Sequence, residues 1–330
     1  MKQPAVVRRA AYAAACALLF PLSGAASFAQ SVIATIPAQE GSLGVPLSIA
    51  VNPLTQLVYI AGNGVEVVNQ RTNTPVTTLD IGENNESGIA INPVSRMLYV
   101  TDYFTGMYVF DLKTNTVVST LPLFVARGVA YNPLTNRVYT LDNLGNVWVN
   151  DGTTGALIHE IVTGASQAFT ITINPVTNRI YLPEQTEPGQ LVVVDAGTNA
   201  VTTVPLQGNL PYDAAVDPLR NIIYVSDNLG QVDVLDGATN TETATITGIP
   251  LQPGALSLDP LTRQVYLSNQ GQNEVEVIDG ATNTLTSKVI PVGATPNFST
   301  IDLVHGLLYV GNSAEFENGS PMSVSVISLK

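Results

Sequence analysis

Short apolar runs separated by turn residues fill the chain after residue 30. In one stretch the runs are 88–92, 97–101, 107–111 and 117–121, with Pro, Gly, Asn and Asp between them. Val, Ile, Thr and Tyr dominate these runs, which favours pleated strands. No longer run carries helical periodicity. The pattern therefore predicts an all-β protein.

The pattern repeats, and an Asx-Pro pair marks each repeat. A tyrosine follows seven residues after each Asx, and the copies are spaced by 40 to 43 residues. A seventh copy begins at Asp302, where Leu303 replaces proline. The other pairs begin at Asn52, Asn92, Asn132, Asn174, Asp217 and Asp259, and the tyrosines are Tyr59, Tyr99, Tyr139, Tyr181, Tyr224, Tyr266 and Tyr309. We expect these tyrosines to pack in the core.

Four strands per repeat are typical of one blade of a β-propeller. Seven repeats predict a single seven-bladed domain over 30–330, with four antiparallel strands in each blade. Small residues occupy one equivalent place in the first strand of each unit, which allows seven strands to crowd around an axis. They are Ala50, Ala90, Ala130, Thr172, Ala215, Ser257 and Thr300.

The two ends of the chain predict how the ring closes. The seventh unit ends with its third strand, at 323–330, and lacks a fourth. The segment 31–37, Ser-Val-Ile-Ala-Thr-Ile-Pro, resembles the fourth strand of other units, such as 243–246. We therefore expect 31–37 to pair with the C-terminal strand, which removes an open sheet edge.

The repeat resembles the YVTN family of β-propeller repeats. The nearest matches are Tyr99-Val100-Thr101-Asp102 and Tyr224-Val225-Ser226-Asp227, together with the identical Asp-Gly-Ala-Thr-Asn-Thr turns at 236–241 and 279–284. The resemblance covers about 31–330 and implies an exported, surface or periplasmic propeller without a shared catalytic set. Lactonase and quinoprotein propellers are similar in strand pattern, so the resemblance alone does not separate these functions.

The first 29 residues are typical of a signal peptide. Lys2, Arg8 and Arg9 precede an apolar stretch over 10–22, and Ser27 and Ala29 fit a cut before Gln30. Export to the periplasm or the extracellular space is therefore expected, and no other stretch is apolar enough to span a membrane. The single cysteine, Cys16, lies inside this segment, so the mature chain has no thiol or disulfide.

Charge limits the choice of partner. Without residues 1–29 the chain keeps 10 basic and 26 acidic residues, a net charge of −16. Because nucleic-acid binding depends on neutralising phosphates, this balance argues against a nucleic-acid partner. Two histidines are too few for a Ser-His-Asp triad or a His-rich metal site. We expect a monomer.

The two faces of the predicted ring differ in variability. The Asx-Pro and Asp-Gly turns share one face and repeat. The other face carries the links between blades and the loops 102–106, 142–146, 183–190 and 314–321, which differ from unit to unit. Variable loops on a rigid scaffold are where binding usually occurs. We therefore place the candidate binding site at the channel mouth on this variable face.

One position of the variable face predicts a ring of polar residues, ten residues after each Asx: Gly62, Asp102, Asp142, Glu184, Asp227, Asn269 and Asn312. One hypothesis is a site for a polyol or a cation, for which calcium is the candidate; no other cofactor is predicted. The alternative is that each Asx caps its own turn.

The blade links contribute Glu83, Glu86, Arg127, Tyr212 and Asp213. Arg127 could hold an anionic or carbonyl group, with a solvated or ion-paired arginine as the alternative. The function predicted from these features is a binding scaffold for a protein or glycan partner. The alternative is a propeller enzyme of the lactonase or quinoprotein type, using the carboxylates and Arg127 at the channel mouth.

Overall fold

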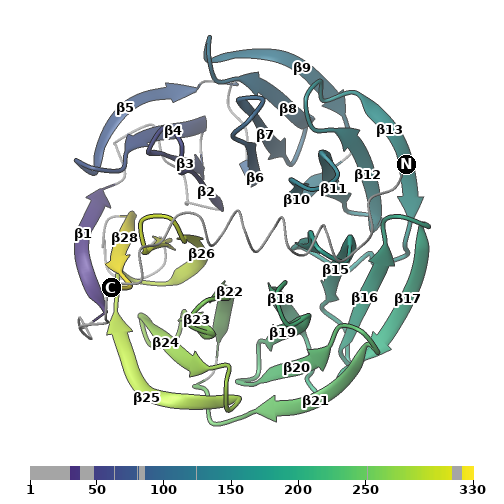
Figure 1. Ribbon diagram of the computed structural model, residues 1–330, viewed down its shortest axis with the longest axis vertical. Coiled ribbons are helices and arrows are strands. Elements are labelled where there is room, and N and C mark those ends of the chain that lie inside the picture. Colours follow the sequence, from purple (N-terminus) through teal and green to yellow (C-terminus); the bar gives the residue numbers. More distant parts are fainter. Residues whose placement is uncertain are drawn as a thin grey trace.

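The computed structural model describes residues 30–37, 48–62, 64–79, 81, 86–123, 125–250, 252–313 and 322–330. These residues form seven four-stranded antiparallel sheets, arranged radially around an axis (Figure 1). The predicted seven-bladed β-propeller is thereby confirmed. The predicted signal segment 1–29 lies outside the described residues. No described helix is long and apolar enough to cross a membrane.

Each blade runs from an inner strand at the axis to an outer strand at the rim (Figure 1). Blade one holds β2 (Ser48–Asn52), β3 (Leu57–Gly62), β4 (Gly64–Asn69) and β5 (Thr74–Leu79). Blade two holds β6 (Glu86–Asn92), β7 (Met97–Asp102), β8 (Gly106–Asp111) and β9 (Thr116–Pro122). Blade three holds β10 (Ala126–Asn132), β11 (Arg137–Asp142), β12 (Asn146–Asp151) and β13 (Leu157–Val162).

The other four blades follow the same order. Blade four holds β14 (Thr172–Asn174), β15 (Arg179–Glu184), β16 (Gln190–Asp195) and β17 (Ala200–Pro205). Blade five holds β18 (Pro211–Asp217), β19 (Ile222–Asp227), β20 (Val232–Asp236) and β21 (Thr241–Ile246). Blade six holds β22 (Pro253–Asp259), β23 (Gln264–Asn269), β24 (Glu274–Asp279) and β25 (Thr284–Pro291). Blade seven holds β26 (Pro296–Asp302), β27 (Leu307–Asn312), β28 (Ser323–Ser328) and β1 (Ser31–Pro37).

The repeated Asx residue ends the inner strand and organises the turn that follows. In all seven units its Oδ1 accepts the backbone N–H two residues on. The fourth turn residue then takes a positive φ, as at Asn136 and Asn178. In three units the Asx is an asparagine whose amide also reaches the following blade: Asn132 Nδ2, for example, donates to Asn178 Oδ1 at 2.8 Å. On the repetitive face, side-chain hydrogen bonds therefore connect neighbouring blades.

The core consists of apolar layers between neighbouring blades. The described buried residues form seven clusters, one at each interface between two blades. The seven repeated tyrosines are all buried, which confirms their predicted packing role. Each sheet therefore buries both of its faces, and no blade has a core of its own.

The N-terminal strand closes the ring as predicted. β1 pairs antiparallel with β28, from Ser31 opposite Ser328 to Pro37 opposite Ser323 (Figure 1). Ile36 of β1 is fully buried in the cluster between blades seven and one. Val32 packs against the cluster between blades six and seven. One short strand thus contributes to two blade interfaces.

We predict that Ile36→Ala lowers the free energy of unfolding by about 2–5 kcal/mol, because truncating a buried isoleucine leaves a cavity. Ile33→Ala is the matched control, since Ile33 lies in the same strand and is 56% exposed. Urea denaturation of both variants measures the difference. Equal stability of the two variants would show that β1 is not part of the packed ring.

Candidate functional site

A cavity of about 610 Å³ lies at the axis, at the starts of the inner strands. The inner strands end at the Asx-Pro turns, so their starts open on the variable face. Tyr103 and Gln185, from loops after second strands, also line the cavity. This channel-mouth pocket has the size of a small-molecule site.

All seven blades contribute one lining residue at the same place in the repeat, four residues before the Asx. We call this set the mouth ring. Its members are Ser48, Gly88, Gly128, Thr170, Asp213, Ala255 and Phe298. The residue one step earlier lines the pocket in three blades, as Arg127, Phe169 and Tyr212.

Two members of the mouth ring are glycines packed closely against neighbouring strands. A Cβ on Gly88 would meet Thr101 Oγ1 at 2.8 Å, and a Cβ on Gly128 would meet Ile171 Cγ2 at 2.8 Å. No larger residue fits at either position without a shift of its neighbours. The larger members of the mouth ring therefore lie in blades four, five and seven, and Asp213 is its single charged member.

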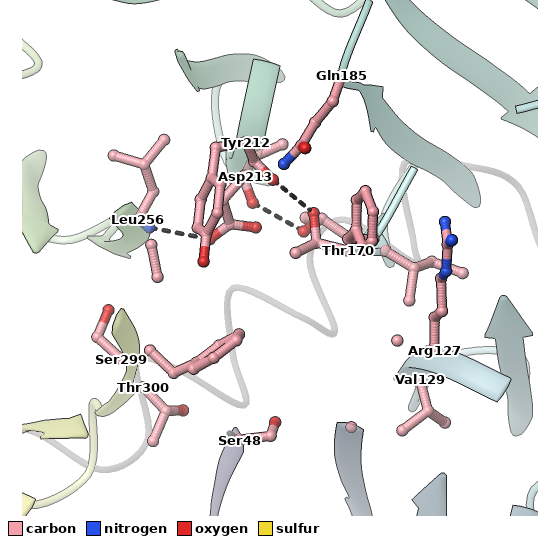
Figure 2. Close-up of a pocket in the computed structure, with 18 of the residues that line it drawn as sticks. Ser48, Arg127, Val129, Thr170, Gln185, Tyr212, Asp213, Leu256, Ser299 and Thr300 are labelled. Atoms are coloured by element: carbon pink, nitrogen blue, oxygen red, sulfur yellow. Dashed lines mark hydrogen bonds between the residues drawn. The ribbon is translucent and has the colours of Figure 1, made fainter. Parts of the chain in front are cut away.

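Arg127 forms a rim on one side of the pocket (Figure 2). Its Nη1 donates to the carbonyl oxygens of Ala168, at 2.5 Å, and Ser166, at 3.3 Å. Its guanidinium carbon lies 4.0 Å from the centroid of the Phe169 ring, a cation–π contact. Burial lowers the pKa of the guanidinium. The alternative interpretation expected a solvated or ion-paired arginine. Arg127 is instead half-buried, makes no ion pair with a described residue, and donates to carbonyl groups of its own chain.

Tyr212 and Asp213 form another side of the pocket (Figure 2). The Tyr212 hydroxyl donates to Asn297 Oδ1, which also accepts Gln270 Nε2 at 2.8 Å. Asp213 Oδ2 accepts the backbone N–H of Leu256 at 2.9 Å. Burial raises the pKa of the Asp213 carboxyl to about 6, against the backbone N–H groups that lower it. Asp213 makes no ion pair with any described residue.

The ring predicted ten residues after each Asx does not line the pocket. Asp102, Asp142, Glu184, Asp227, Asn269 and Asn312 are all buried, and all lie beside it rather than in it. Asp102, Asp142, Asp227 and Asn269 cap local backbone N–H groups, as the alternative interpretation expected. Glu184 accepts the Gln167 N–H, and the Asn312 amide donates to Ser323 and Ser325. These hydrogen bonds commit the six side chains to nearby groups of the protein.

Among the described residues no three His, Cys, Asp or Glu side chains are grouped so as to hold a metal ion. Calcium binding stays a prediction, which a melting-temperature titration with calcium would test. Of the predicted binding residues, Arg127 and Tyr212 line the pocket. Glu83, the side chain of Glu86 and the loop 314–321 lie outside the described residues.

No family model matches the sequence, and no curated protein matches it either. Solved structures do match. A chain of Kuenenia stuttgartiensis hydrazine synthase has a TM-score of 0.74 and 15% identity, over 87% of this chain and 96% of that one. U3-55K has a TM-score of 0.77 and 11% identity, over 90% and 98%. The WD40 repeats of RRP9 have a TM-score of 0.79 and 11% identity, over 92% and 99%.

At this identity the likeness is one of fold alone. The chain is similar to whole seven-bladed propellers, one of them named as part of an enzyme and one as WD40 repeats. The fold thus serves both enzymatic and interaction proteins, and the function has to be argued from the site. The YVTN resemblance is not confirmed by any family model.

Beneath the variable face, the last residue of the second strand is hydrogen-bonded to a residue of the third strand in blades three, six and seven. In blade three Trp148 Nε1 donates to Asp142 Oδ2 at 2.9 Å. In blade six the Asn269 amide donates to Glu276 at 3.3 Å, and in blade seven Asn312 donates to Ser325 at 3.0 Å. These pairs each join a donor to an acceptor.

Blade five breaks this rule, because both partners are aspartates. Asp227 and Asp233 are each 2% exposed, and Asp227 Oδ2 and Asp233 Oδ1 have no hydrogen-bond partner. A Cβ on Gly208 would lie within 2.9 Å of a carboxylate oxygen from each, so the two carboxylates flank one spot. Burial, with the charges of Glu242 and Asp227, raises the pKa of Asp233 to about 6.

This pair makes stability depend on pH. As pH rises, the unfolded chain loses the Asp233 proton near its ordinary pKa of 3.8, whereas the folded protein keeps it until about 6. The folded state binds more protons between these values, so its stability falls as pH rises through this window. The loss is complete above about pH 6.

We predict that Asp233→Asn raises the free energy of unfolding by roughly 1–3 kcal/mol at pH 8 and changes it little at pH 4. An amide at this position can donate to Asp227, as Asn269 does to Glu276. Urea denaturation from pH 4 to 8 measures the effect, with Glu160→Gln, an exposed residue of β13, as the control. A gain that is the same at both pH values would contradict the carboxylate-pair account.

Proposed function

We propose that this chain is an exported propeller of the YVTN-repeat kind that binds a protein or glycan partner at the channel-mouth pocket. The observation that carries the proposal is the mouth ring, in which one position of the repeat supplies lining residues from all seven blades. That position has the same place in each repeat but holds Ser, Gly, Thr, Asp, Ala or Phe. Constant geometry with varied chemistry favours recognition over packing.

The walls of the pocket also support binding. Phe169 is 45% exposed although it is a large aromatic residue, and Arg127 stacks on its ring. Aromatic and arginine side chains with restricted rotamers dominate the energetics of recognition surfaces, because they bury much area at little entropic cost. Phe169 is therefore the residue we expect to contribute most contact area at the rim.

Export is the second part of the proposal. Gln30, the first residue after the predicted cut, donates from its amide to Tyr266 Oη at 2.9 Å. The closing strand begins one residue later. A cut before Gln30 would therefore release the mature protein with every described part of the ring intact.

To test binding, purified mature protein can be screened against glycan and peptide arrays, and each hit measured by calorimetry. We expect Phe169→Ala to weaken a hit by about tenfold or more, as loss of an aromatic anchor does. Leu54→Ala is the control, because Leu54 is 71% exposed on the opposite, Asx-Pro face. Equal loss in both variants, or no hit at all, would count against the pocket. Turnover in a lactone-hydrolysis assay would favour the enzyme interpretation instead.

To test export, the full chain can be produced in a secreting bacterial host and its N-terminus identified by mass spectrometry. We expect a mature protein that begins at Gln30 in the periplasmic or extracellular fraction. Ala29→Tyr should block processing, because signal cleavage requires a small residue before the cut. A protein that keeps Met1 and stays in the cytoplasm would refute the export proposal.

A further inference from the structure

We propose that the channel-mouth pocket, as the binding site of the proposed function, takes a single ammonium group on an apolar stem, a lysine side chain of a protein partner, with Asp213 as its counter-ion. Three observations support the proposal. Asp213 is the single charged member of the mouth ring, hydroxyls around the pocket already have hydrogen-bond partners, and the mature chain is expected to carry a net negative charge.

Asp213 is a carboxylate that has no counter-charge among the described residues. Arg127, the cation that lines the same pocket, lies on a different side of it, stacked on Phe169 and bonded to two carbonyl oxygens (Figure 2). The groups that face Asp213 are the Thr170 hydroxyl, the phenol of Tyr212 and the backbone N–H groups of Leu256 and Ala214. None of them is cationic. A ligand ammonium would therefore supply the charge that the protein itself does not.

Several hydroxyls in and around the pocket are already engaged within the protein. Thr170 Oγ1 donates to the Tyr212 carbonyl at 3.2 Å, and Tyr212 Oη donates to Asn297. Thr172 Oγ1 donates to the Ala214 carbonyl at 2.7 Å, and the Ser257 and Ser299 hydroxyls bond each other at 2.8 Å. A saccharide needs many free donors and acceptors at once. The Asp213 carboxylate is a single strong acceptor among hydroxyls that already have partners, and this arrangement fits one ammonium group better.

The rest of the wall suits the stem of such a group. Val129, Ile171, Leu256 and Phe298 line the pocket together with the ring of Tyr212. A lysine side chain can pack its methylenes against this surface while its ammonium reaches Asp213, and aromatic faces attract a cation further. The net charge of −16 expected for the mature chain would also steer a basic protein toward it.

The test is calorimetry at pH 7.5 with an acetylated, amidated Gly-Lys-Gly peptide and its norleucine counterpart, which differs by the ammonium. We expect the norleucine peptide to bind about tenfold more weakly or worse, since charge-assisted bonds contribute at least that factor. Asp213→Asn should remove the preference for lysine. Asp195→Asn, the same change at a turn on the opposite face, should keep it, because an asparagine can still accept the N–H groups of Gly197 and Thr198.

The wild-type protein offers a second measurement that needs no variant. Because the carboxyl pKa is about 6, roughly a tenth of Asp213 is ionised at pH 5. We expect the lysine peptide to bind about tenfold more weakly at pH 5 than at pH 7.5, and the norleucine peptide to change little. A melting curve of each variant shows whether it is folded.

Four outcomes would overturn the inference. Equal affinity for the two peptides, or a lysine preference that survives Asp213→Asn, removes the role of the carboxylate. Binding of a neutral oligosaccharide such as maltotriose that Phe169→Ala abolishes, with no peptide binding, rejects the ammonium but keeps the pocket as a site. No binding by any probe or array rejects the proposed function as well.

Discussion

The structure depends on the antiparallel pairing of the first described strand with the last. Each blade buries both faces of its sheet against two neighbours, so an open ring would leave two apolar faces exposed to water. β1 prevents this by completing blade seven from the other end of the chain. Stability here is a property of the ring, because Ile36 belongs to an interface between blades whose remaining members come from both ends of the sequence.

Closure also fixes where chemistry can occur. The seven inner strands surround a common axis and present equivalent residues to it. One position of the repeat therefore forms a ring of seven residues around the axis. The Asx end of these strands is committed to turns and to amide bonds between blades. At the other end the members of the mouth ring differ from blade to blade. Recognition can thus vary without disturbing the packing.

Much of the fold followed from the sequence because its determinants are local and repeated. The Asx-Pro turn, the tyrosine and the closing strand each depend on a few adjacent residues, and all three are observed. The site was predicted less well. The position ten residues after the Asx is polar in six of the seven units. Asp102 and Asp142, however, accept the backbone N–H groups of Phe104 and Leu144, which no spacing reveals. Arg127 and Tyr212 do line the pocket, but they lie at the starts of the inner strands β10 and β18 and not in links between blades, where the sequence placed them.

The sequence does contain a signal for the pocket, in one aligned position of the repeat. Aligning the seven units on the Asx places Ser48, Gly88, Gly128, Thr170, Asp213, Ala255 and Phe298 in one column, whose diversity contrasts with the uniform tyrosine column. The raised pKa of Asp213 could not be read from that column, because it arises from burial of the carboxyl in the folded ring.

A raised carboxyl pKa alone does not mark a site in this protein. Asp233 and Glu276 have the same feature as Asp213, with pKa values of about 6 and about 7, but both are 2% exposed and neither lines the pocket. Burial of these two carboxylates lowers stability, and no ligand in the pocket can offset the loss. Replacing Asp233 with asparagine should therefore stabilise the fold. Burial of the Asp213 carboxylate lowers stability in the same way, but Asp213 lines the pocket, where a ligand can reach it. Accessibility from the channel mouth therefore separates a carboxylate suited to recognition from those that the packing merely tolerates.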